Sequence, residues 1–229
     1  MKRWDVLNRL ARFNGAERYL EIGVQNGESM RHVDVREKWG VDPVPTLAGV
    51  TACDVFFRMT SIDFFQRACA TNAPTEQDLS GDKRRLPPRS SVRFADTLVG
   101  ADLVFIDGYH SSELVYKEVE LACDILSSKG LIALHDVGPT TEAMQSDLPV
   151  PGDWTGDVWK AVVRMRREGR HDVRVVDTDF GVAIVKPHQG GGPRLLPDDE
   201  KLSWDLLTRE RERLLGIIKE DDLEEWLKS

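Results

Sequence analysis

The sequence contains a series of short apolar segments that each run directly into an acidic residue. Short apolar runs bounded by turn residues are typical of buried strands, and stretches with helical periodicity separate the early ones. A chain that alternates such strands with helices folds into an α/β structure, a mostly parallel sheet with helices on both faces. The segments that carry this pattern are RYLEIGV (18–24), WGVDP (39–43), SVRFAD (91–96), DLVFIDG (102–108) and LIALHD (131–136).

Helices are expected between these strands at 28–36 and 112–127, and after the last of them at 157–168. In the second of them, apolar side chains recur at helical spacing, on Val115, Val119, Ala122 and Leu126. Residues 54–70, DVFFRMTSIDFFQRACA, are predicted to form one or two helices. The last two strands, VRVVD and GVAIVKP, are joined by only three residues, TDF. A crossover helix does not fit there, so these strands should be antiparallel.

The composition changes after residue 188. We expect residues 1–188 to form the main domain, the Gly- and Pro-rich segment 189–199 to be a linker, and 200–229 to be an acidic helical C-terminal extension. Two alternatives stay open for the apolar side chains of this extension. They contact the core of the same chain, or they contact a second copy in a homodimer or higher homo-oligomer.

Charge and cysteine content restrict the partners and the location. The 229-residue chain has a formal net charge of −8, which disfavours binding to the phosphates of nucleic acids. Its three cysteines, Cys53, Cys69 and Cys123, form no CxxC motif and read as reduced thiols. The first residues have no apolar core of a secretory signal, and no apolar run approaches the ~20 residues that cross a bilayer. We therefore expect a cytoplasmic protein without membrane or nucleic-acid partners.

Four expected strands end on acids: Glu21, Asp42, Asp107 and Asp136, the last preceded by His135. Ligands of parallel sheets bind outside the carboxyl ends of the strands. A single acid at such a place is more often a helix cap or a solvated loop residue. Four acids at four strand ends favour a functional site.

The loop after the first strand has features of a nucleoside site. Gly23 and Gly27 allow a tight turn and a close approach of backbone N–H groups to a ligand. Asp42 follows Gly23 by nineteen positions, a spacing that suits hydrogen bonds to ribose hydroxyls. The glycine spacing is G-x-x-x-G, however, and not the G-x-G-x-x-G of dinucleotide enzymes, which makes a nicotinamide dehydrogenase a poor candidate.

These motifs carry a resemblance. The chain resembles the class I S-adenosylmethionine-dependent methyltransferases in the motif LEIGVQNGES and in the later VDP and IDG. The resemblance extends from Tyr19 to Lys186. FIDGYHSSELVYKEVELACDILSSKGLIALHDV (105–137) is similar to a group of small-molecule O-methyltransferases that act on sugars and natural products. The resemblance implies a Rossmann-like, seven-stranded, mostly parallel sheet with an antiparallel last strand, and S-adenosyl-L-methionine as cofactor.

Positions of the cofactor-binding residues follow from the resemblance. Glu21, Gly23 and Gly27 would surround its methionine part, and Asp42 would hold the ribose. Ala95 and Asp96 would lie near the adenine, and Asp107 next to the transferred methyl group. An acidic pocket is compatible with the sulfonium cation of this cofactor.

Asp107, His110, His135 and Asp136 should converge on the acceptor, and two roles are open for them. In the first, Asp107, His135 and Asp136 hold Mg²⁺ or another divalent cation that lowers the pKa of the acceptor hydroxyl. Related magnesium-dependent enzymes have acids at these places, and the histidine here also suits a softer metal. In the second, His110 or His135 is a general base. The alternative for His110 is a purely structural contact.

The sequence thus predicts an S-adenosylmethionine-dependent O-methyltransferase for a small polar acceptor, such as a sugar or glycosylated natural product. Asp153, Trp154 and Asp157 are further candidates for acceptor contacts. One alternative is methylation of a nitrogen acceptor, although the Asn/Asp-Pro-Pro-aromatic turn typical of such enzymes is absent from IDGYH. The other is a non-catalytic cofactor-binding module, in which the clustered acids and histidines would have no purpose.

Overall fold

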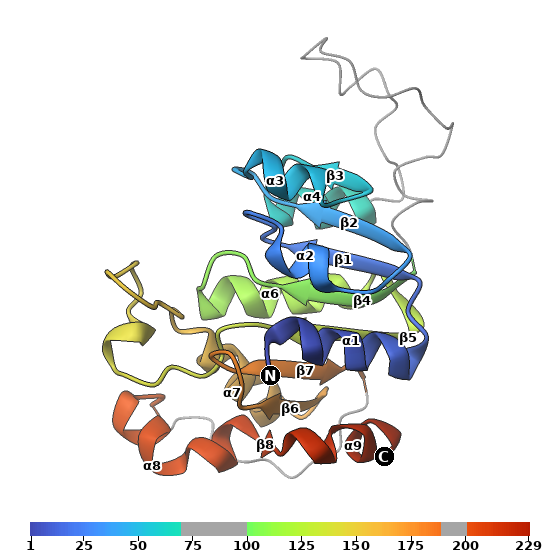
Figure 1. Ribbon diagram of the computed structural model, residues 1–229. Helices are drawn as coiled ribbons and strands as arrows, with labels where there is room; N and C mark the ends of the chain where they lie inside the picture. The colour runs from blue at the N-terminus through green and yellow to red at the C-terminus, as the bar shows by residue number, and fades with distance from the viewer. Residues whose placement is uncertain (70–99, 189–200) are drawn as a thin grey trace.

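A single mixed sheet forms the centre of the molecule (Figure 1). The computed structural model describes residues 1–69, 100–188 and 201–229. Within them the sheet has eight strands in the order β3-β2-β1-β4-β5-β7-β6-β8. The strands are β1 (Arg18–Ile22), β2 (Glu37–Val41), β3 (Val55–Phe57), β4 (Ala101–Ile106), β5 (Leu126–Leu134), β6 (Asp172–Val176), β7 (Val182–Lys186) and β8 (Ile217–Ile218).

Strand directions confirm the predicted α/β, mostly parallel sheet. Strands β3, β2, β1, β4 and β5 run parallel, whereas β7 is antiparallel to both β5 and β6. The turn between β6 and β7 is too short for a helix, as the sequence indicated. Two of the eight strands in the described residues, β3 and β8, were not among the seven expected, and β8 pairs with β6 in parallel at the edge.

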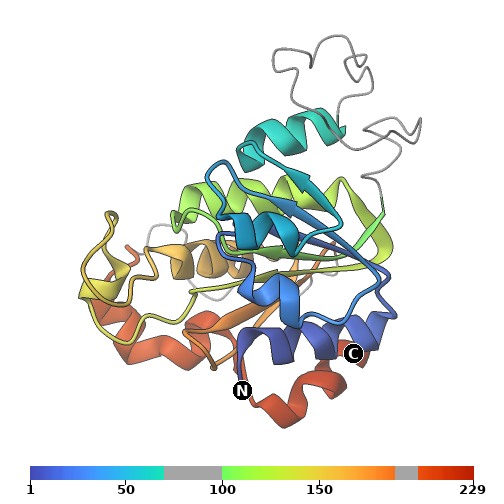
Figure 2. The same ribbon diagram turned by 45° about the horizontal axis from the view of Figure 1, so that its top comes forward.

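Helices cover both faces of this sheet, as Figures 1 and 2 show. The side chains of α4 (Ser61–Cys69), α6 (Ser112–Cys123), α7 (Val158–Glu168) and α8 (Trp204–Leu215) pack on one face. The other face carries α1 (Arg3–Asn14), α2 (Glu28–His32), α3 (Leu47–Thr51) and α9 (Leu223–Lys228). None of the helices in this described part of the chain has the length and apolar character needed to span a bilayer.

Several local expectations were wrong. Residues 55–57 form β3 and not part of a helix, because pairing with β2 satisfies their backbone groups. The first predicted helix ends at His32 and not at residue 36. Helix α6 ends at Cys123, since the chain already enters β5 at Leu126. The predicted strand 91–96 and linker 189–199 lie outside the described residues.

The C-terminal segment packs on the sheet of its own chain. Leu206, Leu207, Leu214 and Leu215 of α8 are buried in the same core as the sheet and α7. The extension predicted to be helical also contains a short strand: Gly216, with a φ of 63°, ends α8 and allows β8 to pair with β6. A 3-10 turn (Glu220–Asp222) and α9 follow. Of the two alternatives for these leucines, contact with the same chain is the one observed.

Candidate active site

The carboxyl ends of the parallel strands border one cavity of about 750 Å³. Its wall contains most of the predicted site residues: Glu21, Gly23, Asp42, Asp107, His110, His135 and Asp136. The parallel strands bring these side chains together because each lies at or just beyond the same end of its strand. Gly27 is not part of the wall, and Asp96 and Ala95 lie outside the described residues.

The glycine loop is shaped by contacts that only glycine permits. Gly23 has a φ of 88°, and a Cβ there would lie 2.1 Å from the carbonyl oxygen of Asp107. The loops after β1 and β4 therefore touch at this point. Gly27 has a φ of 74°, and its Cβ would lie 2.9 Å from the Cβ of Ala52. Gly27 thus shapes the loop by packing next to α3, whereas Gly23 borders the cavity.

Glu21 and Asp42 are buried acids at this end of the cavity. Glu21 accepts a hydrogen bond from the Tyr19 hydroxyl at 2.7 Å, and burial raises the pKa of Glu21 to about 8. The carboxylate of Asp42 accepts from the backbone N–H groups of Gln25 at 2.8 Å and Val44 at 2.7 Å. Asp42 therefore ties the loop after β1 to the loop after β2.

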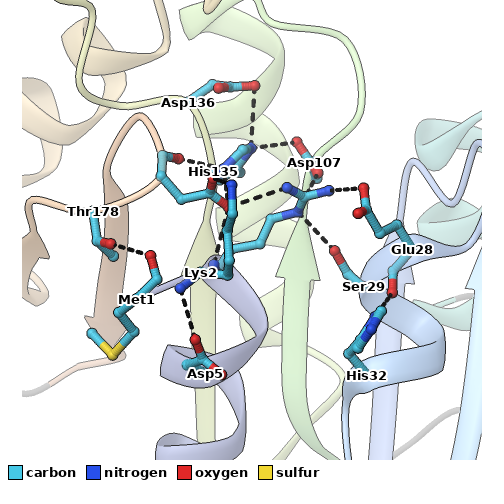
Figure 3. A network of polar contacts seen from close by, with 12 residues as sticks. Met1, Lys2, Asp5, Glu28, Ser29, His32, Asp107, His135, Asp136 and Thr178 are labelled. Atoms are coloured by element: carbon cyan, nitrogen blue, oxygen red, sulfur yellow. Dashed lines mark hydrogen bonds and ion pairs between the residues drawn. The ribbon is translucent and has the colours of Figure 1, made fainter.

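His135 lies between acceptors on both sides of its ring (Figure 3). Its Nε2 is 2.7 Å from the carbonyl oxygen of Asp179. Its Nδ1 is 3.1 Å from Oδ1 of Asp107 and 3.3 Å from Oδ2 of Asp136. Burial alone would lower the pKa of His135, but Asp107 and Asp136 raise it to about 10. Both ring nitrogens therefore donate, and the ring is an imidazolium.

His110 faces the same two carboxylates from the other side. Its Nδ1 lies 3.1 Å from the carbonyl oxygen of Trp154, and its ring stacks on that indole with 4.8 Å between centroids. A carbonyl only accepts, so Nδ1 carries a proton. The other nitrogen, Nε2, is 3.2 Å from Oδ2 of Asp136 and 3.8 Å from Oδ1 of Asp107.

One ligand atom each from Asp107, His110 and Asp136 lies within 4.8 Å of the other two, so that the three could hold a metal ion. Burial by itself would raise the pKa of Asp107, but His135, His110 and Arg3 together lower it. Asp136 has a φ of 57°, an uncommon conformation for a residue other than glycine. Strained residues of this kind cluster at functional sites.

Two residues of this site were missed from the sequence. Arg3 of α1 places its Nε 3.7 Å from Oδ2 of Asp107, and Asp179 of the β6–β7 turn accepts from Arg3 and from Lys2. The apolar spacing in residues 6–11 would have predicted α1. No sequence pattern indicated that its first turn reaches the carboxyl end of β4.

The loop between β5 and α7 supplies the outer wall. Gly152, Asp153 and Trp154 border the cavity, together with Tyr109 and Phe180. Asp157 does not. Its carboxylate accepts from the backbone N–H of Ser112 at 2.7 Å and from the Ser112 hydroxyl at 2.9 Å. Asp157 therefore holds the start of α6, a contact that only the tertiary structure reveals.

The site and fold agree with comparisons to known proteins. A family model described as "Methyltransferase domain" matches residues 20–137, a span that contains Glu21, Asp42, Asp107, His110 and Asp136. The chain belongs to this methyltransferase family. The match confirms the family-level resemblance found in the sequence. No curated protein sequence matches the chain.

Solved methyltransferase structures share the fold at low sequence identity. A putative caffeoyl-CoA O-methyltransferase from Staphylococcus aureus is 14% identical, with a TM-score of 0.52, and the match covers 80% of this chain and 81% of that one. An O-methyltransferase from Bacillus cereus, solved in complex with SAH, is 15% identical with a TM-score of 0.50, covering 80% of each chain. At these low identities the two comparisons show that the fold is shared.

Proposed function

We propose that this methyltransferase transfers a methyl group from S-adenosyl-L-methionine to a hydroxyl of a small polar acceptor, such as a sugar or glycosylated natural product. The observation that carries the proposal is the convergence of Asp107, His110 and Asp136 beside the glycine loop in one cavity. The family match and the O-methyltransferase neighbours support the reaction type. The acceptor class rests on the sequence resemblance.

The donor would lie along the carboxyl ends of β1, β2 and β4. Its amino-acid part would occupy the space beside Gly23, its ribose the space beside Asp42, and its sulfonium the space beside Asp107. All three residues line the same cavity. Acids around this cavity are compatible with a sulfonium, which carries a positive charge.

A divalent cation fits Asp107, His110 and Asp136. Because His110 Nδ1 carries a proton, its Nε2 presents either a second proton or a lone pair to the two carboxylates. A lone pair beside two carboxylate oxygens is a ligand set for a cation such as Mg²⁺ or a softer divalent metal. The predicted set contained His135 in place of His110. Both nitrogens of His135 face other acceptors, so we propose His110 as the nitrogen ligand.

When bound, such a cation would lower the pKa of an acceptor hydroxyl. The chain's own residues do the rest by positioning. Trp154 fixes the His110 ring, and the Asp179 carbonyl fixes the His135 ring. Methyl transfer is an in-line displacement on an activated sulfonium, so orientation of the acceptor supplies much of the rate. Without a cation, His110 would act as the general base, the second role predicted from the sequence.

Calorimetric titration tests the donor. We expect S-adenosylmethionine to bind and NAD to leave no heat of binding, and the reverse result would contradict the methyltransferase assignment. The metal is tested with EDTA followed by Mg²⁺ or Mn²⁺, during assay of glycosylated acceptors with radiolabelled donor. We expect EDTA to reduce turnover and a divalent cation to restore it.

Two variants sharpen the metal test. His110→Ala should weaken Mn²⁺ binding at least tenfold, about 1.4 kcal/mol. The matched control is His32→Ala, because His32 is an exposed histidine that bonds to the Glu28 carbonyl. Unchanged Mn²⁺ affinity and EDTA-resistant turnover in the wild type would assign His110 to the general-base role instead.

The predicted location and partners stay predictions. Cys53, Cys69 and Cys123 are free thiols in the structure, which agrees with a reducing compartment such as the cytoplasm. We propose no nucleic-acid partner, because the net charge is −8. Homo-oligomer formation is open to measurement by light scattering.

A further inference from the structure

The turn between β6 and β7 has an uncommon backbone conformation. Its ends are joined by a hydrogen bond from the Gly181 N–H to the Thr178 carbonyl at 2.8 Å. The two central residues, Asp179 and Phe180, have φ values of 50° and 64°. Hairpin turns of this left-handed kind usually contain Asn-Gly or Asp-Gly, and a bulky side chain such as that of Phe180 is strained there. Strain of this kind persists only where surrounding contacts enforce it.

Contacts from two other parts of the chain enforce the turn. In the loop after β5, the backbone N–H of Gly138 donates to the Phe180 carbonyl at 2.7 Å. From the first turn of α1, the backbone N–H and the guanidinium of Arg3 donate to the Asp179 carboxylate at 3.1 and 3.2 Å. The turn is therefore clamped between helix α1 and the loop that leaves the carboxyl end of β5.

Asp179 makes its contacts on the two sides with two different groups. Its carboxylate is 6% exposed and accepts from Arg3. Burial alone would raise the pKa of Asp179, but the hydrogen bond from the Arg3 backbone is first among the contacts that lower it. Its backbone carbonyl accepts from Nε2 of His135 at 2.7 Å. The side chain thus fixes the residue whose carbonyl holds the His135 ring.

That carbonyl controls the orientation of His135 in the site. The opposite ring nitrogen, Nδ1, lies 3.1 Å from Asp107 Oδ1 and 3.3 Å from Asp136 Oδ2 (Figure 3). A histidine ring held at only one nitrogen can turn about its Cβ–Cγ bond, because that torsion has broad minima. The two carboxylates would then lose a fixed donor. Small displacements of this kind reduce the rate of a reaction that depends on orientation.

We propose that Asp179 is a positioning residue for methyl transfer. Held by Arg3 through its carboxylate, it fixes the His135 ring through its carbonyl. The ring in turn keeps Asp107 and Asp136 oriented toward the acceptor. This inference rests on the proposed function, since it concerns the acceptor side of that site. It makes the β6–β7 turn and the first turn of α1 supports of the acceptor site.

Asp179→Gly removes the carboxylate and keeps the backbone carbonyl, and glycine adopts a φ of 50° without strain. We expect the rate at saturating substrates to fall about tenfold or more, with the affinity for S-adenosylhomocysteine unchanged in calorimetry. Asp179→Asn should recover part of the rate, since an amide oxygen still accepts from Arg3. Rates are measured with radiolabelled donor and glycosylated acceptors.

Proton NMR gives a second readout that needs no substrate. The wild type should show two slowly exchanging ring N–H protons of His135, because both nitrogens donate. His135→Gln assigns them by their loss. In Asp179→Gly the Nε2 proton should exchange faster with water. A turn that only stabilises the fold would change neither this signal nor the rate of the folded protein.

Asp177→Gly is the matched control. Asp177 lies in the same hairpin, is 51% exposed and pairs with Arg211, so the rate and the His135 signals should be unchanged. A wild-type rate and an unchanged Nε2 signal in Asp179→Gly would overturn the proposal. If that variant does not fold, the same two results in Asp179→Asn would overturn it. Wild-type protein that shows the His135 signals but transfers no methyl group would instead overturn the proposed function.

Discussion

Two acids in the wall of the same cavity have pKa values that are shifted in opposite directions. Asp107, after β4, has Arg3, His110 and His135 within 4 Å of its carboxylate, and these neighbours lower its pKa in spite of burial. Glu118, on α6, is 1% exposed. Burial raises the pKa of Glu118 to about 7, and only a hydrogen bond from Ser61 opposes the shift.

The contrast shows that the number of cationic partners, and not burial alone, decides whether a buried acid is charged. Asp107 keeps its charge at neutral pH and is able to attract a cation or an ammonium. Glu118 has no such partner, and its Oε2 has no hydrogen bond within the described residues. Its contact with Ser61 connects α6 to α4. One acid is therefore suited to chemistry, and the other to holding two helices together.

The largest effect is expected at the charged acid. Asp107→Ala should reduce turnover at least 1000-fold, about 4 kcal/mol in the barrier. The variant lacks the carboxylate that we expect to face both the acceptor hydroxyl and a bound cation. Binding of S-adenosylhomocysteine should stay within about tenfold, ~1.4 kcal/mol. Turnover is measured by methyl transfer from radiolabelled donor, and binding by calorimetry.

Asp153→Ala is the control for this change, since Asp153 is an exposed acid in the same wall. It should retain turnover within tenfold. If Asp107→Ala abolished donor binding instead, Asp107 would belong chiefly to the donor site.

The second-largest effect is expected in the pH dependence of stability, at Glu118. The folded pKa of Glu118, about 7, is above its unfolded value of about 4.3. The folded state therefore binds the proton more tightly, and unfolding free energy falls as pH rises between these values. Glu118→Gln removes this dependence. Relative to wild type, the variant should gain about 2–4 kcal/mol between pH 4.5 and pH 8, measured by urea unfolding.

Glu113→Gln on the same helix is the control, because the Glu113 side chain is 84% exposed. Its stability difference from wild type should not depend on pH. A pH-independent difference for Glu118→Gln as well would mean that Glu118 is charged in the folded protein, and the contrast with Asp107 would fail.

The smallest effect is expected at Lys2, an exposed partner of Asp179. Lys2 donates to Asp179 at 3.0 Å, but its side chain is 59% exposed. An exposed ion pair of this kind contributes about 0.5 kcal/mol or less. Lys2→Ala should therefore change stability and turnover little, in urea unfolding and methyl-transfer assays. A loss of more than about 1 kcal/mol in unfolding free energy would contradict the expectation that this exposed pair contributes little.

Much of the fold was readable because strand and helix patterns are local. Apolar runs at 18–22 and 101–106 became β1 and β4, and the helical spacing from Val115 to Ala122 became α6. Residues 55–57 misled the prediction, because three apolar residues before a helical segment carry no period of their own. Only pairing with β2 made them a strand.

The candidate site was partly predictable for a similar reason. Glu21, Asp42, Asp107 and Asp136 each follow a strand, and the rule that parallel strands end at one edge brings them together. The sequence could not predict whether His110 or His135 would be the nitrogen ligand. It depends on which oxygens face each ring nitrogen, and those belong to Trp154 and Asp179, both distant in sequence.

The sequence by itself determined the alternating strands and helices, the edge at which the acids collect and the resemblance to methyltransferases, because these depend on residue order and short-range periodicity. The tertiary structure alone decided that α1 delivers Arg3 to Asp107, that α8 and β8 complete the sheet, and that Asp107 is charged while burial favours the neutral form of Glu118. Those outcomes depend on contacts between residues far apart in the chain, since burial and Coulomb interactions act through space.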